Sequence, residues 1–316
     1  MILNQPRIVF MGTPEFAVSS LKALVENNFN IVAVVTAPDK PAGRGMKMQE
    51  SAVKQYAVSQ NLPVLQPVKL KDPEFIESLK ALQADLQIVV AFRMLPEIVW
   101  NMPPLGTLNV HGSLLPQYRG AAPINWAIIN GEKETGVTTF KLKHEIDTGA
   151  ILLQDKMTIG ENETAGEIHD RMKEIGAGLL VKTVKALINH SVEEKPQEIT
   201  EHQKHAPKIY TETCRIDFSK TAKEVHDLIR GLSPFPGAFT SFEGKSLKIF
   251  KTRLTAISTD KQPGEIDTNK KNTFQISCSD NWLEVVELQL EGKKKMGVED
   301  FLRGYRFQEA ATLRVV

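Results

Sequence analysis

The feature that most constrains the fold is a series of short apolar runs separated by helical segments. Four runs are rich in apolar and β-branched residues, as in strands that are buried in a sheet: residues 7–12 (RIVFMG), 31–36 (IVAVVT), 86–92 (LQIVVAF) and 106–112 (GTLNVHG). Strands that alternate with helices indicate βαβ units. The sequence therefore predicts an α/β unit with a doubly wound, mostly parallel sheet.

Helix signals lie at both ends of this unit. After the first run, Thr13 is expected as an N-cap, with Pro14 at the first helical position and Glu15 close behind. Residues 164–188 form a long amphipathic pattern that is expected to close the unit.

The composition changes after this helix. The stretch that follows is polar, has little periodicity and contains two prolines, which is typical of a linker. Beyond it come one helix and several short alternating segments, which predict a small β-barrel or sandwich. We expect a first domain at residues 1–190, a linker at 191–208 and a second domain at 209–316.

Composition excludes several classes of protein. Hydrophobic residues make up 41% and charged residues 24% of the chain, and the net charge is +1, so the whole molecule is not a polycation. No apolar run is long enough for a membrane span, and the first residues do not resemble a cleaved signal. Cys214 and Cys278 suggest neither a zinc site nor a disulfide framework. A reduced, cytoplasmic setting is expected.

Asn109 and His111 lie two residues apart near the end of the fourth strand. Side chains at i and i+2 share a face, so both are expected to point the same way where open parallel sheets bind ligands. A histidine can exchange a proton near neutral pH, and an asparagine amide can donate to an oxyanion. The pair suits addition at a carbonyl, but such side chains also satisfy backbone groups at strand ends.

Asp147, followed by Thr148 and Gly149, stands in a turn between two further predicted strands. This turn can equally be a solvated loop. A carboxylate at the same edge of the sheet would instead pair with His111, fix its tautomer and stabilise its protonated form. Asn109, His111 and Asp147 would then form one proton-handling and oxyanion-stabilising set.

Longer runs around these residues resemble a known family. NVHGSLLPQYRGAAPINWAI and ETGVTTFKLKHEIDTGAIL are similar to the signature of the 10-formyltetrahydrofolate-dependent formyltransferases, and FMGTPEFAV, APDKPAGRG, LPVLQP and VVAFRMLP also have counterparts there. HAPKIYTETCRIDFSKTAKEVHDLIRGLSPFPGA and LQLEGKKKMGVEDFLRG extend the resemblance over nearly the whole chain. It is strongest with members that act on initiator methionyl-tRNA, and it implies a Rossmann-like formyltransferase domain followed by an OB-like β-barrel domain.

The resemblance implies a mechanism. The neutral α-amino group of methionine on initiator tRNA would attack the formyl carbon of 10-formyltetrahydrofolate. Asn109 and His111 would stabilise the oxyanion of the tetrahedral intermediate. Asp147 would stabilise the imidazolium and, through water, help to move a proton to N10 of the leaving folate. No metal is expected, because no ligand cluster has suitable spacing, and the family implies a monomer.

Matching positions imply the substrate contacts. The folate would be bound by Phe92, Arg93, Leu95, Ser113, Leu114, Leu115 and Pro116, with Arg93 standing where the family usually has glycine. The tRNA would be bound by a basic loop and a basic turn, through Lys40, Arg44, Lys47, Lys293, Lys294 and Lys295. Lysine contacts to phosphates give salt-dependent, sequence-independent affinity. Without the resemblance, a solvated surface is the commoner interpretation of either basic segment.

Three alternatives stay open from the sequence. A nucleotide-binding Rossmann protein is disfavoured because the first strand–helix turn, GTPEFA, lacks the GxGxxG pattern. A non-catalytic RNA-binding module would not need Asn109, His111 and Asp147. Formyltransferases for sugars or glycinamide ribonucleotide, and formyltetrahydrofolate hydrolase, share the chemistry, but the second domain and the loop of Arg44 favour tRNA.

Overall fold

The computed structural model describes residues 5–42, 46–198, 203–307 and 313–315. The chain forms two compact units. The first unit comprises Met1–Gly120, Gly136–Met157 and His169–His205, and the second comprises Ala121–Thr135, Thr158–Ile168 and Ala206–Val316. The second unit therefore takes two segments from within the predicted first domain. The boundaries expected at residues 190 and 209 stay a prediction.

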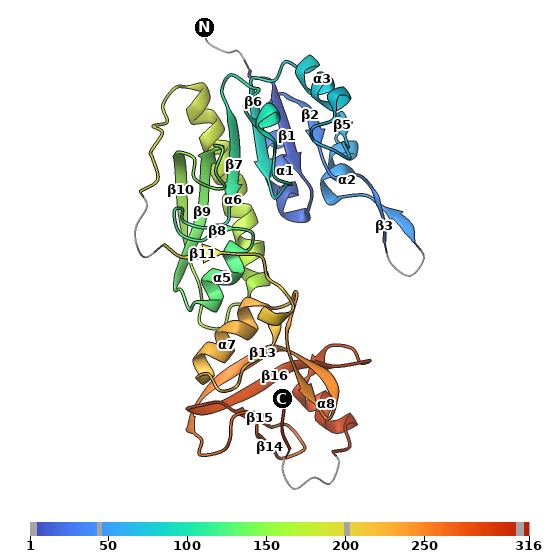
Figure 1. Ribbon diagram of the computed structural model, residues 1–316, viewed down its shortest axis with the longest axis vertical. Helices are drawn as coiled ribbons and strands as arrows, with labels where there is room; N and C mark the ends of the chain where they lie inside the picture. Colours follow the sequence, from blue (N-terminus) through green and yellow to red (C-terminus); the bar gives the residue numbers. More distant parts are fainter. Residues whose placement is uncertain (1–4, 43–45, 199–202, 308–312, 316) are drawn as a thin grey trace. The chain divides into compact units, whose positions relative to one another are not determined.

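The first unit is built on a seven-stranded sheet with the order β10-β9-β7-β6-β1-β2-β5 (Figure 1). Its strands are β1 (Ile8–Gly12), β2 (Ile31–Val35), β5 (Val64–Leu65), β6 (Leu86–Val90), β7 (Thr107–His111), β9 (Glu134–Lys141) and β10 (Ile151–Thr158). The pairs from β5 through β7 are parallel, and β9 runs antiparallel to β7. The predicted doubly wound, mostly parallel sheet is confirmed.

Helices cover both faces of this sheet. On one face, Val9 and Met11 of β1 share a core cluster with Phe75 of α3 (Pro73–Ala81) and Val99 of α4 (Glu97–Trp100). On the other face, a Cβ at Gly12 would lie 2.7 Å from the Cβ of a residue in α1 (Glu15–Glu26). A side chain at Gly12 would therefore push α1 off the sheet.

The long helix α6 (Ala165–Ile188) is confirmed within one residue of its predicted start. Thr164 caps it, because its hydroxyl accepts from the backbone N of Glu167 while the Glu167 carboxylate accepts from the backbone N of Thr164. The bond from the backbone N of Thr164 to the carboxylate holds the pKa of Glu167 below its ordinary value. The expected cap of α1 is wrong by one residue: Pro14 is the N-cap, without a side-chain bond, and the helix begins at Glu15.

Short elements complete the part of the first unit that the structure describes. The predicted basic loop contains the hairpin of β3 and β4, and two short strands, β8 and β11, pair with each other. These four strands are β3 (Lys40–Ala42), β4 (Lys47–Gln49), β8 (Arg119–Gly120) and β11 (His205–Ala206), and the helix α2 (Ala52–Ser59) follows β4.

The second unit is an antiparallel sheet with helices, as predicted. Its strands follow the order β12-β13-β16-β15-β14, and β17 pairs with β16. The elements are α5 (Pro123–Ile129), η1 (Glu212–Cys214), α7 (Ala222–Gly231), β12 (Ala238–Phe242), β13 (Lys245–Ser258), β14 (Ile266–Thr268), β15 (Phe274–Ser277), β16 (Asn281–Leu290), β17 (Met296–Gly297) and α8 (Val298–Gly304).

Residues near the C-terminus join the two edges of this antiparallel sheet. Val315 forms a bridge with Phe242 at the end of β12, and Arg314 forms one with Glu265 beside β14. Val315 is also 2% exposed and belongs to the core of the unit. Backbone pairing across the two edges closes the sheet in the manner of a barrel.

Two expectations from composition can be compared with the structure. Cys214 and Cys278 are buried and unpaired with each other, and burial raises the pKa of Cys278 to about 12, so this thiol stays protonated at neutral pH. Over the described residues, no helix combines the length and the apolar composition that a bilayer crossing requires.

We predict that His226 makes the second unit less stable in acid. It is 1% exposed, its Nδ1 bonds Thr252 Oγ1 at 2.8 Å, and its Nε2 donates to Glu161 O at 3.1 Å. Burial lowers its pKa, so the unfolded chain binds an extra proton as the pH falls below about 6.5. Stability should therefore decrease from pH 7.5 to pH 5.5.

Thermal unfolding at a series of pH values checks this. The loss of Tm over that interval should be smaller in His226→Gln than in the wild type, whereas His190→Gln, at an exposed position, should retain the full loss. Equal losses in all three proteins would remove His226 from the acid dependence.

Candidate active site

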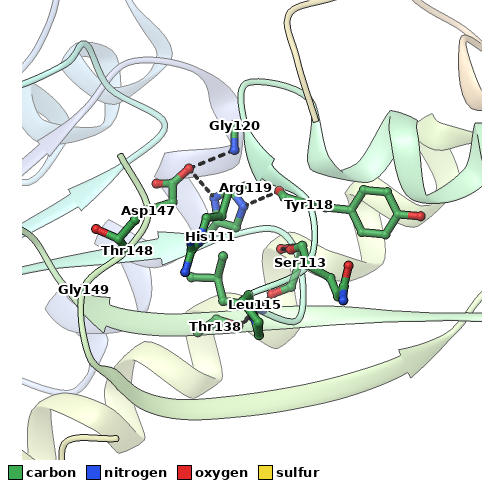
Figure 2. A network of polar contacts seen from close by, with 12 residues as sticks. His111, Ser113, Leu115, Tyr118, Arg119, Gly120, Thr138, Asp147, Thr148 and Gly149 are labelled. Carbon is green, nitrogen blue, oxygen red and sulfur yellow. Dashed lines mark hydrogen bonds and ion pairs between the residues drawn. The ribbon is translucent and has the colours of Figure 1, made fainter. Parts of the chain in front are cut away.

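His111 is the last residue of β7 and is 7% exposed. Its Nε2 lies 2.9 Å from Tyr118 O, and its Nδ1 lies 3.8 Å from Asp147 Oδ2 (Figure 2). A carbonyl oxygen only accepts, so Nε2 carries a proton and donates to Tyr118. The separation at Nδ1 is longer than a hydrogen bond. The ring is thus fixed through one nitrogen, while the other faces a carboxylate.

Asp147 reaches His111 by a different route from the one the sequence suggested. We expected its turn at the carboxyl end of the parallel strands. Because β9 is antiparallel, its last residue, Lys141, pairs with Leu108 near the start of β7. His111 lies three residues, or about 10 Å, further along β7. The loop between β9 and β10 must therefore fold back along the sheet to bring Asp147 to His111.

Close packing and backbone bonds stabilise this folded-back loop. The Oδ2 of Asp147 accepts from Gly120 N at 3.0 Å, and Asp147 itself has φ of 55°, a left-handed conformation that aspartate tolerates better than most residues. Gly149 is buried, and a Cβ there would lie 1.6 Å from Lys141 O. Only glycine fits at this position, because the clash would be with backbone.

The turn after β7 is tied to β9 beneath the site. Thr138 Oγ1 donates to Ser113 O at 2.7 Å and accepts from Leu115 N at 3.1 Å and Gln154 Nε2 at 2.9 Å (Figure 2). Ser113 Oγ donates to Gln117 O at 2.6 Å. Ser113 and Leu115 are buried and Leu114 and Pro116 half-buried. Ser113 therefore shapes the turn through its own side chain.

Asn109 lies on the same face of β7 as His111. Its partner in the register is Val89 on β6, and cross-strand partners point to one face. Val89 and Leu95 belong to the same core cluster, and Phe92 packs against this cluster. The structure thus brings two of the predicted folate-binding residues to the sheet face that carries Asn109 and His111.

Arg93 donates to the backbone of the segment that follows β5. Its Nη1 donates to Val68 O at 3.0 Å and its Nη2 to Pro67 O at 2.8 Å, and its guanidinium lies over the Phe92 ring. The charge is therefore used to bind the segment after β5. Its predicted role in folate binding stays a prediction.

The predicted tRNA-binding residues differ in their surroundings. Lys40 is exposed, Arg44 lies outside the described residues, and Lys47 stands in β4. Lys293 and Lys294 are exposed. Lys295 forms an ion pair of 2.8 Å with Glu287 and lies over the ring of Phe250, so its charge is already partly neutralised.

One group of potential metal ligands occurs in the described part of the chain, formed by Glu15, His169 and Asp170. Lys173 already offsets part of its negative charge, since its Nζ lies 2.7 Å from Glu15 Oε1 and 3.5 Å from Asp170 Oδ1. The bond to Glu15 raises the pKa of Lys173. The expectation that no metal is required stays a prediction.

Several residues that hold the site together were not predicted from the sequence. Gly120 donates its backbone N–H to Asp147, and Arg119 bonds the amide of Gln197, which in turn bonds the loop of Asp147. Arg119 and Gly120 stand in a run that carries the family resemblance. Gln197 lies in the polar segment predicted as a linker, and no periodicity there distinguishes it.

Two models of known protein families match the chain. A model described as "Formyl transferase" matches residues 6–184, and one described as "Formyl transferase, C-terminal domain" matches residues 208–306. The chain belongs to the formyl transferase family. The resemblance seen in the sequence is confirmed.

Curated relatives are similar over nearly their full length. The protein named methionyl-tRNA formyltransferase of Bacteroides fragilis is 51% identical over 318 residues, which cover 98% of each chain. The protein of the same name from Phocaeicola vulgatus is 56% identical over 310 residues, covering 95% of this chain and 96% of the relative.

Solved structures share the fold at lower identity. The sugar 3N-formyl transferase WlaRD, crystallised in the presence of dTDP and 5-N-formyl-THF, has a TM-score of 0.67 at 23% identity and covers 92% of this chain and 100% of its own. HypX from Aquifex aeolicus in complex with tetrahydrofolic acid has a TM-score of 0.65 at 17% identity. That match covers 98% of this chain and 51% of HypX. At these identities the likeness shows the fold alone.

We predict that Gly149→Ala disrupts the folded-back loop. The added methyl group would overlap a backbone carbonyl, so the loop must move and the chain should lose about 2 kcal/mol or more of unfolding free energy. Denaturant titration measures this loss. Gly178→Ala is the matched control, because no atom beyond its chain neighbours and its own helix backbone lies within 4 Å of its Cβ position, and alanine favours a helix by about 1 kcal/mol relative to glycine. Equal stability of the two variants would contradict the proposed packing.

Proposed function

We propose that this protein transfers the formyl group of 10-formyltetrahydrofolate to the α-amino group of methionyl initiator tRNA. The observation that carries the proposal is the placement of His111 between Tyr118 O and the Asp147 carboxylate. The chain that holds this site is 51% and 56% identical, over nearly its whole length, to two relatives named methionyl-tRNA formyltransferase. A cytoplasmic monomer is part of the same proposal.

The geometry supports oxyanion stabilisation by Nδ1 of His111. Nε2 already donates its proton to Tyr118 O. The hydrogen bond to the reacting carbonyl oxygen must therefore come from Nδ1. Because Asp147 Oδ2 lies 3.8 Å away, this proton is not consumed by a direct hydrogen bond to the carboxylate. The protonated ring can then donate to the developing oxyanion while the carboxylate balances its charge.

Asn109 supplies the second donor in this proposal. It stands two residues before His111 on β7, on the same face, and is half-buried. An amide held on a strand needs little rearrangement when the carbonyl becomes tetrahedral. The neutral amine would attack the formyl carbon, the C–N10 bond would break, and the proton lost by the amine would pass to N10 through water near Asp147.

The folate and the tRNA are proposed to bind on separate surfaces. The 113–116 turn, Phe92 and Leu95 offer apolar and backbone groups suited to a pterin ring. Lys40, Arg44, Lys47, Lys293, Lys294 and Lys295 are proposed to contact tRNA phosphates. Within the last three, the ion pair of Lys295 with Glu287 favours Lys293 and Lys294 as the main contributors.

We predict that His111→Asn lowers turnover by about 10²–10³-fold, because removing one oxyanion donor has an effect of this size in other enzymes. Formylation of charged initiator tRNA with 10-formyltetrahydrofolate measures it, and thermal unfolding checks folding. His190→Asn is the matched control at an exposed histidine. Retention of more than a tenth of wild-type turnover by a folded His111→Asn protein would count against the role.

The same assay separates the proposal from its rivals. A nucleotide-linked amino sugar or glycinamide ribonucleotide, tested as the acceptor in place of tRNA, should be formylated far more slowly. Water as the preferred acceptor would instead indicate a hydrolase.

We predict that Lys293→Ala with Lys294→Ala weakens tRNA binding and flattens its salt dependence. For each lysine that neutralises a phosphate, its removal should lower the slope of log K against log salt by about 0.7–0.9. Lys295→Ala should have a smaller effect. The control replaces Lys261 and Lys271, which are exposed elsewhere in the second unit. A salt slope unchanged from the wild type would remove Lys293 and Lys294 from the interface.

A further inference from the structure

Gln197 uses the whole hydrogen-bonding capacity of its amide on the active-site loop and its neighbour strand. Nε2 donates to Asp147 O and to Gly149 O, both at 2.8 Å. Oε1 accepts from Arg119 Nε at 3.0 Å and from Arg119 Nη2 at 2.6 Å. An amide has two donor hydrogens and two acceptor lone pairs. All four are used.

The backbone of Gln197 is itself held in place. Two residues earlier, Lys195 exchanges both backbone hydrogen bonds with Ile151 at the start of β10, at 2.8 and 2.9 Å. The connecting segment therefore runs beside β10 where the loop of Asp147 rejoins the sheet. Gln197 is anchored to the strand that ends this loop, so its amide can restrain the loop.

The bonds of Gln197 add a second link between the two chain segments that contact His111. Tyr118 accepts from His111, Gly120 donates to Asp147, and Arg119 stands between them in sequence (Figure 2). Gln197 joins Arg119 to the loop that carries Asp147. The two chain segments that contact the imidazole are thus joined twice, by the bond from Gly120 to the Asp147 carboxylate and by the neutral side chain of Gln197.

We infer that Gln197 is a positioning residue for formyl transfer, which acts by holding Asp147 at its distance from His111. This inference rests on the proposed function of the site. The left-handed backbone of Asp147 requires surrounding contacts to persist. Its carboxylate is held by Gly120 and its carbonyl by Gln197. Removing the bond from Gln197 frees the loop while leaving every group that touches the substrates in the chain.

Two substitutions separate hydrogen bonding from space filling. Gln197→Glu keeps the shape and can still accept from Arg119, but it places oxygen atoms against the carbonyls of Asp147 and Gly149. Gln197→Ala removes all four bonds. Both should lower kcat by about 10-fold or more, because small displacements of catalytic groups have effects of this size, and KM for methionyl-tRNA should stay near the wild-type value. Gln60→Glu and Gln60→Ala, at an exposed glutamine, are the matched controls.

A double-mutant cycle with Asp147→Asn tests whether Gln197 acts through Asp147. In single turnover, Gln197→Ala should slow transfer about 10-fold in the wild-type background and less than about 2-fold in the Asp147→Asn background. The ¹⁵N shifts of the His111 ring should also move in Gln197→Ala and stay fixed in Gln60→Ala, which needs no activity to detect.

Distinct results overturn the two proposals. Equal factors in both backgrounds, a Gln197→Glu protein with wild-type kcat, or unchanged His111 shifts would show that Gln197 only stabilises the chain. A wild-type protein that formylates some other acceptor would overturn the proposed function, and the same ratios measured with that acceptor would still decide the role of Gln197.

Discussion

The folded-back loop between β9 and β10 is the constraint on which the site depends. Antiparallel pairing with β7 carries the end of β9 away from His111, so the carboxylate must be returned along the sheet. Tight contact of Gly149 with the carbonyl of Lys141 makes the return compact. The N–H of Gly120 then receives the carboxylate. Acid and base are brought together by backbone atoms rather than by a direct side-chain bond.

The segment between the two family domains contributes to this arrangement. Lys195 pairs with the start of β10, Gln197 bonds the loop, and Gln203 donates to Pro116 O at 2.6 Å in the turn after β7. A stretch with little helical or strand propensity is thereby fixed at several points of the first unit. The segment therefore connects the two domains and also stabilises the loop and the turn that form the site.

The sequence could predict the strands, the long helix and the shared face of Asn109 and His111, because periodicity determines each of them. It could not predict the direction of β9, since an antiparallel edge strand has the same apolar pattern as a parallel one. Nor could it identify Gln197, because its partners in the loop are backbone carbonyls. Every residue has a backbone carbonyl, so no residue type in the sequence marks such a contact. The turn around Asp147 suited a partner of His111 and a solvated loop equally well, and the family resemblance favoured the partner.

The bridges made by Arg314 and Val315 have a consequence for biosynthesis. Phe242 and Glu265 find their backbone partners in residues that are synthesised long after them. Until those residues leave the ribosome, two strand edges of the second unit expose unsatisfied N–H and C=O groups to other chains. The nascent protein therefore passes through an interval in which its barrel is open to intermolecular pairing, and this interval ends only when the final bridge forms.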